Sequence, residues 1–271
     1  MSKNAINILV TSGGTDCYID DVRVVSNIGT GTFGSQLAEE FLKKGCNVIY
    51  LYSRGAKKPI YRHLRVDDII EFDAEIDKIK EVYSIFHDFI KNITFIEVDD
   101  FDDYEEKLLN LTEKIDIWIM AMAVSDYRPI RTTGKISSND DQLNLKMEKC
   151  PKIITKIRDK YSDAFIVGFK LSSNSNEEKI IKNVSSWIEK SNVDMCVAND
   201  MSGRNGDYRE VYLLKNNTDE YGFYKGPDVS NNIVEDVLAE YYKKINSWSI
   251  DFQSRVINWL SSLVTLIKKK E

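Results

Sequence analysis

The chain has 271 residues, of which 42% are hydrophobic, 30% are charged and only four are proline. This length and composition are typical of one soluble domain with a well-buried core, and a second full domain would have little room. Lysine and arginine total 37 against 43 aspartates and glutamates, a net charge of −6. Because no basic stripe is interleaved with aromatic residues, we expect no nucleic-acid-binding surface.

The cysteines and histidines exclude several kinds of site. The four cysteines are widely spaced and form no CxxC motif, and only two histidines occur. A histidine-rich metal site or a Ser-His-Asp triad is therefore not expected. Since a predicted strand begins within six residues of the N-terminus, we expect no signal peptide, and we predict a cytoplasmic protein with reduced thiols.

Short β-branched runs alternate with helical patterns along the chain. The predicted strands are Ile6–Thr11, Asn47–Tyr52, Ile93–Val98, Ile115–Met122, Ala164–Phe169 and Val193–Ala198. Helices are predicted over Gly34–Lys44 and Ala74–Lys91, and Pro151 is expected in the first turn of another helix. Several strands are apolar throughout, as in buried parallel sheets. The pattern predicts an α/β fold with a doubly wound, mostly parallel Rossmann-like sheet, helices on both faces and a small β-flap.

The C-terminal part has a helical pattern from Asn231 onward. We expect residues 1–246 to form the single domain and residues 247–271 to form a helical extension that packs on the body or on a partner subunit. The apolar stretch Val256–Ile267 is shorter than the about twenty residues that span a bilayer. We therefore expect no membrane partner.

Ligands of a doubly wound sheet bind outside the carboxyl ends of its strands, near a switch in strand order. The loops after Thr11, Met122, Phe169 and Ala198 would open there. The first of these loops is the most informative, because an apolar strand leads into a glycine- and hydroxyl-rich segment that opens a helix. Backbone N–H groups at glycine turns and helix N-termini bind anions. Residues Gly29 to Gly34 have the GxGxxG spacing but do not directly follow the strand Ile6–Thr11, as the dinucleotide fingerprint requires, and GxxxxGK[ST] does not occur in this segment. A different phosphate-binding loop is therefore predicted.

The loop sequences, taken together in chain order, indicate a function more specifically than any single loop does. They read VTSGGTxxxIDxVRxxxN, MAVSDY, KISS, PKII, VGFKL and VAND. This series resembles the phosphopantothenoylcysteine synthetase family of coenzyme A biosynthesis over about Ile8 to Lys244, and it looks most like the monofunctional bacterial type. The resemblance implies a ligase that joins 4′-phosphopantothenate and cysteine through an acyl-nucleotidylate. It also implies CTP or ATP as co-substrate, Mg²⁺ bound through the nucleotide phosphates, and a homodimer.

The resemblance also implies roles for individual residues. Asn27 would contact the phosphopantothenoyl carbonyl, and Lys135 would stabilise charge at the α-phosphate, which makes them the expected catalytic pair. Arg23 would reach the phosphopantothenate of the neighbouring subunit, and Ala123 and Asp126 would contact the pantetheine part. The nucleotide would be bound by Gly14, Gly29, Gly31, Gly34, Gly168, Phe169 and Asn199. We add Lys190 as a candidate cation for its phosphates, in place of lysines of many bacterial relatives that this chain lacks.

Each of these residues also has a structural interpretation: an ordinary glycine turn, a helix cap, a surface ion pair, a core aromatic ring or a solvated lysine. The chain departs from the family in two places. Met122 stands where alanine is frequent, and Ser137 and Ser138 follow Lys135 where many bacterial relatives have lysines.

Two other functions remain open. A short-chain-type NAD(P)-dependent oxidoreductase also begins with a strand, a glycine loop and a helix. However, Asn47–Tyr52 is followed by Ser53 and Arg54 rather than by a ribose-binding acid, and the only YxxxK motif, Tyr221 to Lys225, occurs late in the chain. A non-catalytic regulatory relative of the synthetase would retain the same ligand crevice.

Overall fold

A computed structural model describes residues 5–64, 72–173, 175–205, 208–218 and 220–247 of the chain. The strands of the main sheet are β1 (Asn7–Ser12), β4 (Asn47–Ser53), β5 (Ile93–Val98), β6 (Ile117–Met120), β9 (Phe165–Ser172), β10 (Met195–Asn205), β11 (Tyr208–Lys215) and β12 (Tyr221–Gly226). They form one eight-stranded sheet in the order β12-β11-β10-β9-β6-β1-β4-β5.

The sheet is parallel from β5 to β10, and β11 and β12 complete it as antiparallel strands. Every residue of β6 is buried, as expected for a central parallel strand. The strand order reverses at β1, because β4 and β5 lie on one side of it while β6, β9 and β10 lie on the other. The loops after β1 and β6 therefore open at the switch point, where such sheets bind ligands.

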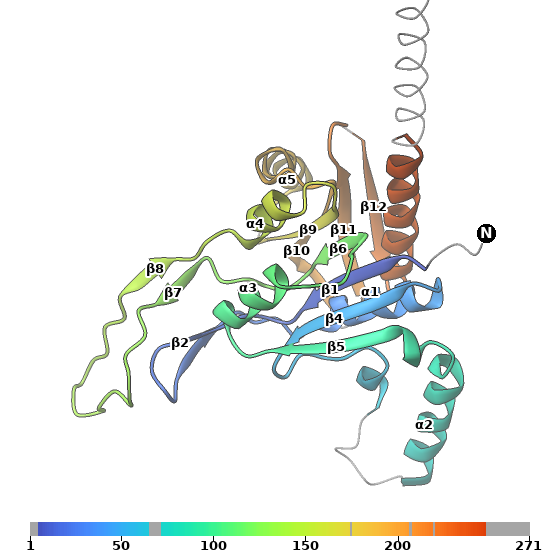
Figure 1. Cartoon of the computed structure of the whole chain (residues 1–271). Coiled ribbons are helices and arrows are strands. Elements are labelled where there is room, and N and C mark those ends of the chain that lie inside the picture. Colours follow the sequence, from blue (N-terminus) through green and yellow to red (C-terminus); the bar gives the residue numbers. More distant parts are fainter. Residues whose placement is uncertain (1–4, 65–71, 174, 206–207, 219, 248–271) are drawn as a thin grey trace, which may run out of the picture. The chain divides into compact units, whose positions relative to one another are not determined.

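Helices cover both faces of the sheet (Figure 1). They are α1 (Thr32–Lys43), α2 (Phe72–Phe86), α3 (Phe101–Leu109), α4 (Ile153–Lys160) and α5 (Glu177–Ser191), with 3-10 turns η1 (Tyr61–His63) and η2 (Ile90–Asn92). Helices α3, α4 and α5 lie on one face, and α1 lies on the other. Trp118 of β6 packs in the core beneath α3 and α4 with Phe101, Tyr104 and Ile157. The predicted fold class is confirmed.

Two local predictions were wrong. The helix predicted over 74–91 ends at Phe86, and residues 90–92 form the separate turn η2. Tyr83 and Ile90, two apolar residues of the predicted range, are exposed. Pro151 precedes the N-cap of α4, Lys152, instead of lying in the first turn.

Two antiparallel ribbons leave the carboxyl edge of the sheet (Figure 1). The first ribbon pairs β2 (Asp16–Tyr18) with β3 (Val24–Ser26) directly after β1. The second ribbon pairs β7 (Tyr127–Pro129) with β8 (Met147–Lys149) after β6. A main-chain hydrogen bond of 2.9 Å from Thr132 to Ile19 joins the two ribbons. They correspond to the predicted β-flap.

The chain divides into two compact units, Met1–Ile233 and Val234–Glu271. Residues 229–247 are helical, as the pattern from Asn231 onward predicts. The predicted extension over 247–271 lies, apart from its first residue, outside the described residues, so its boundary stays a prediction. In the described part of the chain, no helix combines the length and apolarity needed to cross a membrane.

Candidate functional site

The loops after β1 and β6 run side by side beyond the sheet. Gly14 forms a parallel bridge with Ala123. The Ala123 N–H donates to the Gly13 carbonyl at 2.8 Å, and the Thr15 N–H donates to the Ala123 carbonyl at 3.0 Å. This pairing continues the β1–β6 contact past the strand ends. It brings two predicted site residues, Gly14 and Ala123, together at the switch point.

Asn27, directly after β3, is held against these loops. Its N–H donates to the Thr15 carbonyl at 3.4 Å, and its side-chain Oδ1 accepts a hydrogen bond of 3.2 Å from the Ser125 hydroxyl. The Ser125 hydroxyl accepts in turn from the Thr15 hydroxyl at 3.1 Å. Thr15 and Ser125 are buried, with exposed fractions of 1% and 5%. The predicted catalytic amide therefore lies at the switch point, beside two hydroxyls that were not predicted as site residues although both lie inside the quoted motifs.

The glycine turn at the start of α1 has the geometry of an anion cradle. Gly31 is the N-cap with φ +72°, and it has no side chain with which to cap the helix. The N–H groups of the first turn are thus candidates to bind phosphate. A Cβ on Gly29 would lie 2.4 Å from the Gly13 carbonyl oxygen, so this close approach of the two loops requires glycine. Gly34 has a packing role, because a Cβ there would lie 2.4 Å from Ser12 Oγ.

A cavity of about 150 Å³ opens at the carboxyl ends of β6 and β9, beside the start of α4. Apolar side chains that include Met122 and Trp187 line it, together with Ser125, Asp126 and Lys152. Asp126 and Lys152 form an ion pair of 2.5 Å, and both are exposed. Because Ser125 belongs both to the cavity and to the hydrogen-bond chain of Asn27, the cavity adjoins the amide.

The predicted base-binding residues lie on the same edge of the sheet. Phe169 lines the cavity, and its ring contacts Phe33 of α1 edge-on, with 5.9 Å between centroids. Asn199 lies beside Leu171 in the register of β10 and β9. Gly168 has a packing role, because a Cβ there would lie 2.3 Å from the ring of Trp187.

Lys135 lies in the loop between β7 and β8, and its neighbours fix its position. Asp20 accepts a hydrogen bond of 3.0 Å from the Ile136 N–H, and Asp21 accepts one of 3.0 Å from the Gly134 N–H. The Lys135 side chain itself is exposed. The turn of the first ribbon therefore accepts hydrogen bonds from the main chain on both sides of the predicted catalytic lysine.

Asp20 and Arg23 also interact with each other beside this loop. The Arg23 guanidinium donates to Asp20 at 2.5 Å and to the Ile136 carbonyl at 3.3 Å. Burial acts to raise the pKa of Asp20, but hydrogen bonds from the main-chain N–H groups of Val22, Ile136 and Arg23 and from the Arg23 side chain lower it overall. Within this chain Arg23 thus helps to fix the Lys135 loop through its hydrogen bond to Ile136. The sequence did not predict this contact.

Lys190 lies away from the other predicted nucleotide-binding residues, which corrects the expectation for it. It is in the last turn of α5, and the Asp194 N–H, four residues later, donates to the Ile166 carbonyl at the start of β9. A crossover helix returns the chain to the amino edge of the sheet, so its last turn lies opposite the ligand edge. Lys152 and Lys170, which line the cavity, supply cations on the correct edge.

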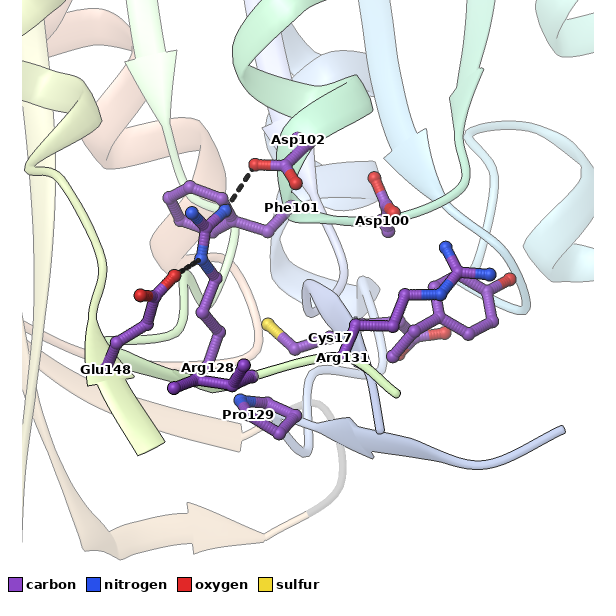
Figure 2. A pocket seen from close by; sticks show the side chains of 11 residues that line it. Cys17, Asp100, Phe101, Asp102, Arg128, Pro129, Arg131 and Glu148 are labelled. Atoms are coloured by element: carbon purple, nitrogen blue, oxygen red, sulfur yellow. Dashed lines mark hydrogen bonds and ion pairs between the residues drawn. The ribbon is translucent and has the colours of Figure 1, made fainter. Parts of the chain in front are cut away.

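A second cavity, of about 230 Å³, lies between the two ribbons and the start of α3. Figure 2 shows Arg128 between Asp102 and Glu148, to which it donates at 2.5 and 2.8 Å. Arg131 lies over the ring of Tyr18, at 4.9 Å from its centroid. Both arginines therefore have partners within this chain.

The family described as the DNA/pantothenate metabolism flavoprotein C-terminal domain matches residues 4–70 and 84–241. The coenzyme A biosynthesis bifunctional protein CoaBC of Methanocaldococcus jannaschii is 30% identical over 239 residues, which is 88% of this chain and 51% of that protein. Phosphopantothenate–cysteine ligase 2 of Oryza sativa subsp. japonica is 26% identical over 233 residues, covering 76% of this chain and 70% of that protein. The chain spans about half the length of the CoaBC relatives.

A solved structure of a Cab2 mutant in complex with phosphopantothenate-cysteine has the same fold. Its TM-score is 0.76 at 20% identity, and the match covers 90% of this chain and 89% of that one. The family match extends over most of the described residues, including both ribbons and the loops after β1, β6, β9 and β10. This chain belongs to the DNA/pantothenate metabolism flavoprotein C-terminal domain family.

Proposed function

We propose that this protein is a phosphopantothenate–cysteine ligase of coenzyme A biosynthesis. The observation that carries the proposal is the junction at the switch point, where Gly14, Ala123, Ser125 and Asn27 are joined by a main-chain bridge and hydrogen bonds. This junction adjoins a helix N-terminus that has a glycine N-cap and suits phosphate, and a cavity lined by both apolar and charged side chains that suits an organic group with polar substituents. The ligase names that several relatives carry support the same activity.

The reaction would proceed in two balanced steps. A carboxylate oxygen of 4′-phosphopantothenate attacks the α-phosphorus of CTP or ATP, and pyrophosphate leaves. The amine of cysteine then attacks the carbonyl carbon of the acyl-nucleotidylate, loses a proton and displaces the nucleoside monophosphate. Since an α-amino group has a pKa near 8 and the acyl group is already activated, no tuned general base is required.

Different residues would act in different parts of this reaction. The Asn27 amide would donate to the acyl oxygen, and the Lys135 ammonium would stabilise charge at the α-phosphate. The first turn of α1 would hold the outer phosphates, while Phe169 and Asn199 would contact the base. In the described residues, no three histidine, cysteine or carboxylate side chains are arranged to hold a metal. Mg²⁺ would enter with the nucleotide, since in such sites it keeps several waters and binds the substrate phosphates together with one or two carboxylates.

The active unit would be a homodimer that joins through the two ribbons. Ile28, next to Asn27, is 98% exposed, and Val22, Ile130 and Leu145 are also exposed apolar residues on the ribbons or their loops. Large exposed apolar residues on ribbons that leave the body of the sheet suit an interface. Sedimentation should show a dimer that Ile28→Lys weakens, whereas Ile79→Lys on α2, also exposed, should leave the mass unchanged.

The test of the activity is pyrophosphate release with 4′-phosphopantothenate, cysteine, Mg²⁺ and either CTP or ATP, each omitted in turn. We expect release to require the acid, the nucleotide and Mg²⁺, and the two nucleotides assayed in parallel will give the base preference. Lys135→Gln should lower the rate at least about tenfold. Lys146→Gln, an exposed lysine of the same loop region, is the control.

The same assay separates the alternative functions. A non-catalytic relative would bind the ligands without releasing pyrophosphate. An oxidoreductase would instead enhance the fluorescence of added NADPH. Either result, obtained with pure folded protein, would contradict the ligase proposal.

A further inference from the structure

The chain of hydroxyls behind Asn27 has a defined direction. The Ser125 N–H donates to Thr15 Oγ1 at 2.9 Å, which makes this oxygen an acceptor from the main chain. The Thr15 hydroxyl proton is then donated to Ser125 Oγ at 3.1 Å. The Ser125 proton is donated to Asn27 Oδ1 at 3.2 Å. Along this chain each hydroxyl accepts from the preceding group and donates to the next, and the chain ends on the amide oxygen. The Ser125 hydroxyl also contacts the Cys17 thiol.

This direction decides which atom of the amide is available to a ligand. Because Oδ1 accepts from Ser125, the free end of the side chain is Nδ2, which carries two N–H donors and no acceptor. The main chain of Asn27 is fixed independently, since its N–H donates to Thr15 and its carbonyl accepts from the Gly29 N–H at 2.8 Å. Rotation of the amide is therefore the main freedom left, and the two hydroxyls restrict it.

We propose that Ser125 and Thr15 are positioning residues, which orient the Asn27 amide so that its Nδ2 faces the acyl oxygen of the substrate. The proposal rests on the proposed ligase function for its catalytic consequence. Turned over, the amide would present the lone pairs of Oδ1 to a carboxylate, which would repel the substrate instead of stabilising charge on it. Since both hydroxyls are buried, bulk water cannot take their place when one is removed.

A double-mutant cycle separates this role from a general structural one. Ser125→Ala should lower kcat about tenfold in the native background, a smaller loss than the roughly 10² to 10³ for removing an oxyanion donor outright. In an Asn27→Ala background the same substitution should change kcat less than twofold, because the group on which it acts is gone. Equal losses in both backgrounds, or no loss in the native one, would overturn the proposal.

The Thr15 position offers a matched pair of variants. Thr15→Val keeps the shape of the side chain and removes the hydroxyl, whereas Thr15→Ser keeps the hydroxyl. We expect Thr15→Val to lower kcat about as much as Ser125→Ala, with the KM for nucleotide changed less than twofold, and Thr15→Ser to retain native kcat within twofold. Ser84→Ala, on the exposed face of α2, is the control for serine removal. An inactive Thr15→Ser protein with native unfolding behaviour would contradict the proposal.

A measurement without substrate distinguishes failure of this inference from failure of the ligase proposal. The side-chain amide of Asn27 gives a pair of ¹H–¹⁵N NMR resonances that Asn27→Ala identifies. Ser125→Ala should shift or broaden them, and Ser84→Ala should leave them unchanged. If the native protein shows no ligase turnover while these resonances respond, the function is wrong and the positioning stands. If they do not respond to Ser125→Ala, the positioning is wrong whatever the enzyme catalyses.

Discussion

Asp20 in the turn of the first ribbon accepts a hydrogen bond of 3.0 Å from the main-chain N–H of Ile136, although 116 residues separate them in the chain. The Asp20 carboxylate is fully buried and also accepts from the Arg23 guanidinium. A buried carboxylate with several donors is a rigid anchor, because each donor would lose its partner if it moved. The position of Lys135, one residue before Ile136, thus depends on the other ribbon.

Asp20→Ala should therefore free the Lys135 loop. Without its acceptor the Ile136 N–H loses its partner, so hydrogen exchange across residues 134–136 should accelerate by an order of magnitude or more, about the effect of losing one buried hydrogen bond. Ligase activity should fall with it. Asp77→Ala, in an exposed ion pair on α2, should change neither quantity. Unchanged exchange in Asp20→Ala would show that the loop is held by something else.

Glu39 on α1 ties down the segment after β4. It is buried, and its carboxylate accepts from the Ile60 N–H at 2.7 Å and from two nitrogens of Arg62 at 2.9 Å each. Glu39→Ala should lower the free energy of unfolding by about 3 kcal/mol, as when one partner of a buried ion pair is removed. The exposed neighbouring pair of Glu40 and Lys43 provides the control, since Glu40→Ala should cost less than about 1 kcal/mol. Urea denaturation measures both.

The same carboxylate predicts a pH dependence of stability. Burial acts to raise the pKa of Glu39, but hydrogen bonds from His63, Arg62 and the Ile60 N–H and the charge of Arg62 lower it below the ordinary 4.5. A lowered pKa means that the folded state binds the proton more weakly than the unfolded state does. Its stabilisation is therefore complete above about pH 4.5 and is lost as the pH falls through the lower folded value. Glu39→Gln should remove this component, and identical acid-unfolding curves for both proteins would contradict the assignment.

Substitution of Gly14 by alanine should lower stability and turnover although it changes no charge. A Cβ at this position would lie 2.2 Å from the main-chain oxygen of Asn27, which a rotamer change cannot relieve. Gly14→Ala should cost about 1–3 kcal/mol of stability through overpacking and should displace Asn27, lowering turnover. At Gly45 an added Cβ has nothing within 4 Å although φ is +79°. Gly45→Ala should therefore cost only the backbone strain of about 1–2 kcal/mol and leave the turnover per folded molecule unchanged.

The placement of Gly14, Asn27 and Ala123 could be predicted from the sequence. Alternating strands and helices indicate a parallel sheet, and a parallel sheet brings the loops after its strands to one edge. Which hydroxyl meets which amide could not be predicted in this way. The contact of Thr15 with Ser125 depends on the register of two loops more than a hundred residues apart, and periodicity contains no information about that register.

The errors have physical causes. Lys190 was assigned to the phosphates as a nearby cation, but the predicted strand at Val193 already indicated that a helix ending there had returned to the amino edge. The helix predicted up to Lys91 followed an apolar period that continues past Phe86, whereas the chain leaves the helix at that residue. The hydrogen bond between Asp20 and Ile136 could not be predicted from the sequence, because a single aspartate in a turn ordinarily caps its own turn.

The most direct test of the account follows one oxygen atom. 4′-Phosphopantothenate labelled with ¹⁸O in its carboxylate is incubated with the enzyme, cysteine, Mg²⁺ and CTP or ATP, and the products are analysed by mass spectrometry. If the carboxylate attacks the α-phosphorus at this site, one ¹⁸O must appear in the nucleoside monophosphate and none in pyrophosphate. Formation of the cysteine amide with ¹⁸O in inorganic phosphate, or with no transfer of label, would contradict the acyl-nucleotidylate mechanism.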